Sequence, residues 1–418
     1  MVRRSRGLVV VTAAACVEIL LTMLGTSGGV DAETLVWSEE FDVFDLSVWN
    51  HLVSGSRGFN NEFEYYRNNR KNSFVKDGVL YLKPTLTAAD YGERFLYQGG
   101  LSHRDCNLSP CETLNETAAV NTSNSPNLLW RLRWCNALKT GAPTDIYASV
   151  VVFYCCAHAH IGEDGEEGGT ARIAGQDIML PIQSARIRTL GSFGFLYGRV
   201  EVRARMPRGD WIWPAIWMKP VDNEYGAWPS SGEIDLVEIR SNRKLRSSQG
   251  LSQGVDRMGA TLHFGVNSSY NIWRPTHWEK SLADQGTDFA ADYHLYGMEW
   301  TEDSIIFTVD GEKIGGVTPP EGGFWKLGGF DESPGGTNIW KNGTRLAPFD
   351  KPFFLILNVA VGGRFFSDSM VNSPFPRPWN WSSPHPMRDF WERRDEWLPT
   401  WDHENSTLRV DYIRVFQP

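Results

Sequence analysis

Basic residues are in deficit in this sequence of 418 residues. It has 41 Lys and Arg against 50 Asp and Glu, which gives a formal net charge of −9 at pH 7. Nucleic acids and anionic membrane surfaces attract positively charged proteins, so this balance argues against both as partners. With 41% hydrophobic and 22% charged residues, the chain can bury a sizeable core, and the composition argues against disorder of the whole chain.

Long apolar runs are absent after residue 24, so no later segment is long enough to span a bilayer. The one such run, Leu8–Leu24, follows the three arginines of MVRRSRG and precedes the small residues GTSGG. This order predicts a signal peptide over residues 1–30 and a secreted, extracellular protein. Glu18 makes the run a poor membrane anchor, and an uncleaved anchor is the alternative.

Glycosylation sequons and cysteines fit an extracellular setting. The chain has seven N-x-S/T sequons, each weak on its own: Asn107, Asn115, Asn121, Asn267, Asn342, Asn380 and Asn405. Cys106 and Cys111 lie close together in a polar stretch and are predicted to close a small disulfide in an oxidising compartment. Cys16 leaves with the signal peptide, and an odd number of cysteines remains: Cys135, Cys155 and Cys156.

Neither a repeat of fixed period nor a convincing long amphipathic helix is present. Short runs rich in β-branched and aromatic residues dominate instead, separated by Gly, Pro, Asn and Asp. Examples are YGRVEVRARM, DYHLYGMEWT, SIIFTVDGEKIGGV and PFFLILNVAVGG, and the VDGE within the third is a hairpin signal. The pattern predicts an all-β sandwich.

The stretch from about Trp130 to Leu180 departs from this pattern. It holds three cysteines, no sequon and an acidic, Gly-rich run. A loop of this length without clear elements is unusual inside a compact domain. A metal site at Cys155, Cys156, His158 and His160 is the alternative, but adjacent cysteines rarely chelate one zinc ion well. We therefore expect an insertion without a metal.

Three carboxylates fall within six residues of SGEIDLVEIRSNR, residues 231–243, a run that otherwise has the composition of a buried strand. On a strand, alternation places Glu233 and Asp235 on one face and sends Glu238 to the other. One extra residue in a β-bulge rotates Glu238 back, whereas helical spacing does not bring the three together. The motif therefore predicts a bulged strand, or else it has no functional meaning.

On a bulged strand, the carboxyls of Glu233 and Glu238 can approach to about 5–5.5 Å, as in retaining glycosidases. Glu233 would then be the nucleophile, Glu238 the acid/base, and Asp235 a support that hydrogen-bonds Glu233. Three clustered carboxylates do not all ionise freely, so at least one stays protonated near neutrality, which suits a general acid. Alone, the motif also fits a solvated strand, but the tryptophans of GDWIWPAIWMKP just upstream favour a sugar cleft.

The segment GEIDLVEIR resembles the active-site strand of family 16 glycoside hydrolases, in particular of their β-1,3-glucanase (laminarinase) branch. Nine further segments are similar to successive segments of that family, in the same order: LVWSEEFD, NNEFEYY, QSARIRT, YGRVEVRARMP, GDWIWPAIWM, TLHFG, DYHLYGMEWT, PFFLILNVAVGG and DYIRVFQ. The resemblance covers about residues 33–117 and 181–418. It predicts a single domain over residues 33–418, interrupted by the atypical stretch at about 130–180.

This resemblance implies a concanavalin-like β-jelly-roll of two antiparallel sheets with a concave substrate cleft. It carries the catalytic roles onto Glu233, Asp235 and Glu238, and it places five substrate-binding candidates in the cleft: Asn61, Arg186, Trp211, Trp213 and His263. No cofactor is implied, although some members bind a structural calcium ion, for which Asp411 is a possible match.

Two features depart from the family pattern. Glu64 stands where many relatives carry Gln, which could alter hydrogen bonding to sugar. The Trp130–Leu180 stretch stands where relatives have a much shorter connection, so it is either a tolerated insertion or sequence translated from a faulty gene model.

Two functions are compatible with the resemblance, because the family includes digestive glucanases and invertebrate β-1,3-glucan-binding (Gram-negative-bacteria-binding) proteins. The first is a secreted, retaining endo-β-1,3-glucanase; the alternative is a recognition protein of innate immunity that binds β-1,3-glucan without turnover. The three acids are retained, and the glucanase-like sequence begins directly after the predicted signal peptide, at ETLVWSEEFD, so we expect no N-terminal glucan-binding module. Both features favour the enzyme. We expect β-1,3-glucan as its partner and a monomeric protein. A purely structural extracellular protein would leave the acids and tryptophans unexplained.

Overall fold

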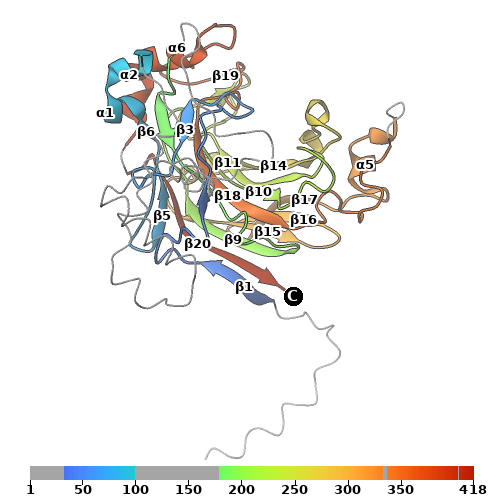
Figure 1. Cartoon of the computed structure of the whole chain (residues 1–418). Coiled ribbons are helices and arrows are strands. Elements are labelled where there is room, and N and C mark those ends of the chain that lie inside the picture. Colours follow the sequence, from blue (N-terminus) through green and yellow to red (C-terminus); the bar gives the residue numbers. More distant parts are fainter. Residues whose placement is uncertain (1–32, 99–177, 333–336, 403) are drawn as a thin grey trace, which may run out of the picture.

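Residues 33–98, 178–332, 337–402 and 404–418 are described by a computed structural model of the chain (Figure 1). Within these residues, most of the regular structure is antiparallel β-sheet and the helices are short. None of the helices among them is long and apolar enough to cross a membrane. The predicted all-β class is confirmed. The predicted signal peptide, the Cys106–Cys111 disulfide and all other cysteines lie outside the described residues.

The first large sheet is built from strands in which apolar and polar residues alternate. In β9, Val200, Val202 and Ala204 are buried, whereas Arg199 and Glu201 on the other face are half-buried. The strands lie in the order β17 (Glu312–Val317), β16 (Ile305–Val309), β15 (His294–Trp300), β9 (Gly198–Arg205), β20 (Leu408–Gln417), β5 (Val79–Leu82) and β4 (Ser73–Lys76). β1 (Thr34–Glu39) also pairs with β20.

The second large sheet carries the acidic motif. Its order is β14 (His277–Ser281), β13 (Arg257–His263), β11 (Glu233–Ile239), β10 (Ile212–Pro220), β18 (Phe353–Val361), β8 (Arg186–Arg188) and β2 (Asn50–His51). All of its described pairings are antiparallel. β18 reads FFLILNVAV and is buried at every position, because both of its faces are covered. Such strands are nearly continuous apolar runs rather than alternating ones.

The main hydrophobic core lies between the two large sheets. From the first sheet it receives side chains such as Val202, Met298 and Phe307, and from the second Ile216, Leu262 and Leu357. Figure 1 shows the two layers stacked, with β9, β15, β16 and β20 in one and β10, β11, β14 and β18 in the other. The predicted sandwich of two antiparallel sheets is confirmed.

A second, aromatic cluster packs on the opposite face of the seven-stranded sheet, at one end. It contains Trp213 of β10, which points away from the main core, and rings from the chain after β18, including Phe366, Trp379 and Trp397. Two short helices carry part of this cluster, α6 (Pro386–Glu392) and α7 (Arg394–Trp397). The cluster closes that end of the sheet, so the rest of the face is left for a site.

Short elements complete the fold. Small sheets are formed by β3 (Glu64–Tyr66), β7 (Ile182–Ser184) and β6 (Thr85–Leu86), with a parallel β3–β7 pair, and by β12 (Arg246–Ser247) with β19 (Met370–Val371). The remaining helices are α1 (Thr87–Tyr91), α2 (Glu93–Gln98) and α5 (Gly323–Leu327). Single 3-10 turns span Ser268–Tyr270, Arg274–Thr276, Ala283–Gln285, Phe330–Glu332 and Leu398–Thr400. α1 and α2 lie beside α6 (Figure 1), and Arg394 pairs with Glu93 at 3.0 Å.

The two sides of residues 99–177 meet at a backbone hydrogen bond. The N–H of Met179 donates to the carbonyl of Leu96 at 2.8 Å, and Ile178, Met179 and Leu180 are buried in the aromatic cluster. These three residues belong to the packed fold, so the predicted insertion, if real, ends before Ile178. The rest of the Trp130–Leu180 stretch lies outside the described residues, and its status as an insertion stays a prediction.

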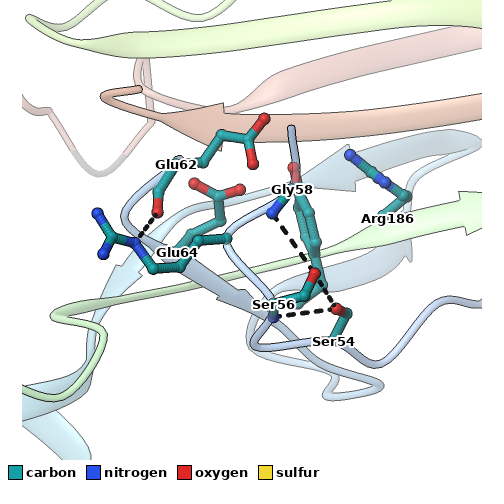
Figure 2. Close-up of a pocket in the computed structure, with 8 residues that line it drawn as sticks. Ser54, Ser56, Gly58, Glu62, Glu64 and Arg186 are labelled. Atoms are coloured by element: carbon teal, nitrogen blue, oxygen red, sulfur yellow. Dashed lines mark hydrogen bonds between the residues drawn. The ribbon is translucent and has the colours of Figure 1, made fainter. Parts of the chain in front are cut away.

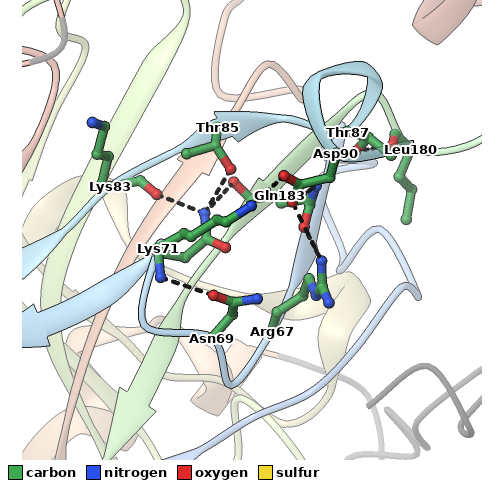
Figure 3. A network of polar contacts seen from close by, with 10 residues as sticks. Arg67, Asn69, Lys71, Lys83, Thr85, Thr87, Asp90, Leu180 and Gln183 are labelled. Atoms are coloured by element: carbon green, nitrogen blue, oxygen red, sulfur yellow. Dashed lines mark hydrogen bonds and ion pairs between the residues drawn. The ribbon is translucent and has the colours of Figure 1, made fainter. Parts of the chain in front are cut away.

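A buried amide, that of Asn72, ties this region together. Its Nδ2 donates to the Lys83 carbonyl and to Thr85 Oγ1, both at 2.9 Å, and to the Gln183 carbonyl at 3.2 Å. Figure 3 shows Lys83, Thr85 and Gln183 gathered at this point. One side chain thus joins the β5–β6 segment to β7, which lies a hundred residues later in the sequence.

We predict that Asn72→Ala lowers the free energy of unfolding by about 2–3 kcal/mol, because it leaves buried acceptors without a donor. Urea denaturation followed by tryptophan fluorescence measures the change. Asn69→Ala is the matched control, since the Asn69 side chain accepts one exposed hydrogen bond, from the N–H of Lys71. Equal losses in the two variants would contradict the role given to Asn72.

Candidate functional site

The acidic strand β11 contains the β-bulge that the sequence requires. Against β10, Trp217 pairs with Asp235 and Ile216 with Val237, so Leu236 has no partner. Against β13 the register shifts between Asp235 and Glu238. Leu236 and Val237 consequently both enter the main core, although they are consecutive. The predicted bulge is confirmed, and beyond it Glu238 returns to the face of Glu233 and Asp235.

Small residues flank Glu238 on both neighbouring strands. Ala215 of β10 and Gly259 of β13 are its cross-strand partners. A Cβ at Gly259 would stand 2.7 Å from the Cε1 atom of His277, so glycine is what allows the His277 ring to lie there. Glu238 therefore has the His277 ring, which lies over Gly259, on one side and the small Ala215 on the other.

His263 contacts the other two acids. It lies opposite Glu233 in the β11–β13 register. Its Nε2 is 3.1 Å from Asp235 Oδ2 and 3.8 Å from Glu233 Oε1. From β10, the neighbouring strand on the other side of β11, Trp213 Nε1 donates to Glu238 Oε1 at 3.0 Å. The site therefore has a cationic group at one end of the acid row and a ring N–H donor at the other.

Burial sets the protonation of the two outer acids. Burial, followed by the charge of Asp235, raises the pKa of Glu238 to about 7. Burial also raises the pKa of Glu233, but the nearby cations His263, Lys219 and Arg186 oppose that shift. At neutral pH, Glu238 is the acid that is best placed to keep a proton.

Asp235 and His263 form a charged pair between them. Burial, and then the charge of Glu233, raises the pKa of Asp235 to about 6, against the hydrogen bond from His263. Burial disfavours the charged imidazole of His263, but the hydrogen bond and charge of Asp235, with the charges of Glu233 and Glu238, outweigh it. The net effect raises the pKa of His263 to about 10.

The same pair bears on metal binding. One donor atom from each of Glu233, Asp235 and His263 lies within 4.8 Å of the others, a spacing that a metal ion could use. A metal would need the neutral imidazole, whereas the acids around His263 raise its pKa and favour the protonated ring. For calcium, Asp411 of β20 accepts a hydrogen bond from Arg203 of β9 and is therefore already paired with a cation. The expectation of no cofactor stays a prediction.

The predicted sugar-binding residues do not all reach the site. His263 and Trp213 adjoin the acids, as described. Arg186 lies on β8 with its guanidinium carbon 4.6 Å from the Tyr66 ring and 5.4 Å from the Trp217 ring. Asn61 precedes β3, half-buried, with a left-handed backbone (φ 54°).

Trp211 differs from the expectation. It is only 2% exposed and packs edge-on against Phe366 and Trp379 in the aromatic cluster. Its backbone is left-handed (φ 69°) and its N–H donates to Asn242 Oδ1 at 3.0 Å, so it stands before the regular alternation of β10 begins. A ring this deeply buried offers no face to a sugar.

Trp217, which is not among the five predicted substrate-binding residues, also lies at the site. It lies opposite Asp235, and its Nε1 donates to Asn358 Oδ1 at 2.7 Å. Alternation from Trp213 along β10 puts Trp217 on the same face, so the sequence held this signal. No sequence pattern indicated a role for Asn358, because it lies inside the apolar run of β18.

A small polar pocket lies beside Arg186. Figure 2 shows its lining residues, which include Glu62, Glu64 and three residues of the loop before them: Ser54, Ser56 and Gly58. Glu64 Oε2 accepts from the N–H of Val361 at 2.8 Å. Glu64 is 2% exposed; burial, and then the charge of Glu62, raises its pKa to about 8, against the hydrogen bonds from Val361 and Tyr66.

Comparison with known proteins gives consistent similarities. The model of the family described as Glycosyl hydrolases family 16 matches residues 172–326. The Beta-1,3-glucan-binding protein of Penaeus monodon is 37% identical over 391 residues, 92% of this chain and 90% of that protein. The Glucan endo-1,3-beta-glucosidase A1 of Niallia circulans is 38% identical over 239 residues, 56% of this chain and 26% of that protein.

Among solved structures, the catalytic domain of an endo-1,3-beta-glucanase (laminarinase) from Thermotoga petrophila RKU-1 is similar to this chain. It aligns with a TM-score of 0.48 at 23% identity, over 93% of this chain and 99% of that one.

The buried Glu64 generates a prediction about stability and pH. Between its usual pKa of 4.5 and its folded value of about 8, the folded state keeps a proton that the unfolded state has released. The free energy of unfolding therefore falls as pH rises through this window. Glu64→Gln cannot titrate, so we expect it to remove a slope of up to about 1.4 kcal/mol per pH unit.

Urea unfolding at pH 5, 6, 7 and 8 measures this slope. The difference between wild type and Glu64→Gln isolates Glu64 from the other buried acids, which titrate in both. Glu299→Gln, on the exposed face of β15, is the matched control and should leave the wild-type slope unchanged. Parallel curves for wild type and Glu64→Gln would show that Glu64 is ionised in the folded state.

Proposed function

Because this chain belongs to family 16 of the glycosyl hydrolases, we propose that it is a retaining endo-β-1,3-glucanase. The observation that carries the proposal is the acid row of β11. The bulge puts Glu233, Asp235 and Glu238 on one face, and their surroundings give them different tendencies to ionise. Retaining glycosidases need this asymmetry, because one carboxyl must attack while the other donates a proton.

In the first half of the reaction, the Glu233 carboxylate attacks the anomeric carbon of the glucan. The C–O bond to the leaving sugar breaks, and Glu238 gives its proton to the departing oxygen. The cations near Glu233, His263 among them, favour its ionised form, whereas the raised pKa of Glu238, about 7, keeps a substantial share of it protonated at neutral pH. Asp235 holds the imidazolium of His263 beside the nucleophile.

In the second half, Glu238 must act as a base and take a proton from water. Glu233 is then an ester to the sugar and has lost its negative charge. The repulsion that links Glu233 and Glu238 is removed, so the pKa of Glu238 falls at the step that needs its ionised form. Attack of the activated water on the anomeric carbon releases Glu233 and completes retention.

Trp217 and Arg186 supply the surface next to the acids. A half-buried indole ring and a guanidinium beside carboxyl groups suit the apolar faces and hydroxyls of a neutral sugar. Names of relatives support a β-1,3-glucan: one is a β-1,3-glucan-binding protein and another a glucan endo-1,3-β-glucosidase.

The second candidate function is glucan recognition without turnover. It is favoured by the name of the Penaeus monodon relative, which matches nearly the full chain. The two candidates share the cleft and differ only in chemistry, so measurement of turnover and of binding on the same protein separates them.

We also propose an extracellular, monomeric protein. The signal-like N-terminus supports secretion, and three sequon asparagines, Asn267, Asn342 and Asn380, are exposed and open to glycosylation. Asn405 is half-buried and engaged: it accepts from Arg205 at 3.0 Å and donates to Asp402 at 2.7 Å. We expect that sequon to be used least.

We predict that the purified wild-type protein releases reducing sugar from laminarin. Glu233→Gln should abolish turnover and still bind the glucan, because it removes the nucleophile but keeps the shape. Glu238→Gln should lower turnover by roughly 10²–10⁴-fold, most for poor leaving groups, and azide should partly rescue an activated substrate.

Glu299→Gln serves again as the matched control and should retain full activity. Lichenan and cellulose, tested beside laminarin, report linkage preference. Laminarin binding with no release by wild type would favour recognition over the enzyme, and unchanged hydrolysis in both active-site variants would refute the mechanism.

A further inference from the structure

A column of stacked side chains continues from Glu238 away from the other acids. Within the described residues, the one hydrogen bond to the Glu238 carboxyl comes from Trp213 Nε1. The Trp213 ring in turn stacks on Phe365, with ring centroids 4.2 Å apart and planes 14° from parallel. Phe365 comes from the turn after β18, so the column joins two distant parts of the chain.

Arg240 closes the far end of the column. Its guanidinium carbon lies 3.8 Å from the centre of the Phe365 ring, and its Nε donates to the Phe365 carbonyl at 2.8 Å. The guanidinium thus holds both the ring and the backbone of one residue. Arg240 follows β11 two positions after Glu238, so alternation places the two side chains on the same face.

The column of Trp213, Phe365 and Arg240 can fix the orientation of the Glu238 carboxyl. The cross-strand neighbours of Glu238, Ala215 and Gly259, have no polar side-chain atom, so they cannot fix its carboxyl by a hydrogen bond. A tryptophan clamped against a second ring has little rotational freedom, and its N–H then defines one position for the carboxyl. A planar guanidinium on the other side of Phe365 keeps that ring in place.

We propose that Phe365 and Arg240 are positioning residues, which hold Glu238 through Trp213, and that the Arg240 charge biases the point at which Glu238 releases its proton. This inference rests on the proposed function, since it gives Glu238 the acid/base role.

The charged groups around Glu238 come from five strands. Besides Arg240, the charged and titratable groups that face it or its acidic neighbours are Glu233 and Asp235 on β11, His263 and Arg257 on β13, His277 and Glu279 on β14, Lys219 on β10 and Arg186 on β8. The acids raise the pKa of Glu238, while His263 and Arg240 lower it. Removal of the Arg240 charge alone therefore raises the pKa of Glu238. In a retaining glycosidase, the acid/base must be protonated for the first step, so the basic limb of kcat/KM moves to higher pH.

The decisive experiment is the pH profile of laminarin hydrolysis in three variants. Arg240→Gln keeps a donor for the Phe365 carbonyl and removes the charge, so the basic limb should move to higher pH. Arg240→Lys keeps the charge but not the planar stacking. The basic limb should therefore keep its wild-type pH, and kcat should fall. Phe365→Leu breaks the column with the charge in place, and kcat should fall roughly tenfold to a hundredfold.

Arg364→Met is the matched control. Arg364 is the neighbour of Phe365 and also stacks on a ring, that of Trp381 at 4.9 Å, but it is exposed and belongs to no part of the column. It should match wild type in rate and in pH profile. A basic limb that stays fixed in Arg240→Gln would overturn the electrostatic part of the inference. Wild-type turnover in Phe365→Leu would overturn the positioning part, even if Arg240→Gln does not fold.

A second readout does not depend on turnover. In protein labelled with ¹³C at the glutamate carboxyls, the resonance missing from Glu238→Gln is that of Glu238, and its titration gives the pKa directly. Arg240→Gln should shift that titration upward. If wild type hydrolyses no laminarin, the proposed enzyme fails, while this titration still decides whether Arg240 acts on Glu238.

Discussion

The single extra residue in β11 is the constraint on which the site depends. A regular strand would bury Glu238 in the main core, where an unpaired carboxylate is very costly. Instead, Leu236 and Val237 both enter the core, and the chain gains a half-turn of rotation before Glu238. The same bulge lets the apolar side chains of Leu236 and Val237 both enter the core and keeps the carboxyl of Glu238 out of it. Core packing and catalytic geometry are therefore not separable at this point.

Burial gives the acid row its chemical character. Each of the three carboxyls is shielded from water, which pushes all of their pKa values upward. They differ because their partners differ: an imidazolium stands beside Glu233 and Asp235, whereas Glu238 has an indole N–H and small neighbours. Glu233 and Glu238 have identical side chains on one strand, but their different neighbours give them different tendencies to ionise. That difference is what separates an acid/base from a nucleophile.

The ends of the site are closed by different means. At one end, the aromatic cluster packs against the sheet and removes Trp211 from solvent. Next to Arg186, the pocket with Glu62 and Glu64 stays polar, and Glu64 is held by the backbone of β18. The glutamate at position 64 introduces a titratable group into that pocket, where glutamine would be neutral at all pH values.

The sequence by itself determined the alternating strands, the all-β class and the three acids on one face. It did so because a period of two and a fixed spacing of carboxylates are local properties: once the bulge is required, Glu233, Asp235 and Glu238 must share a face. It also contained the signal for Trp217, four residues after Trp213.

Only the tertiary structure decided what surrounds those acids. His263, Asn358 and Phe365 come from strands and turns far along the chain, and no local pattern says which of them will meet Glu233, Trp217 or Trp213. The burial of Trp211 followed from a left-handed backbone and from rings more than 150 residues later, which the alternation of β10 alone could not show. Pairing across the sandwich is non-local, and the ionisation of each acid depends on it.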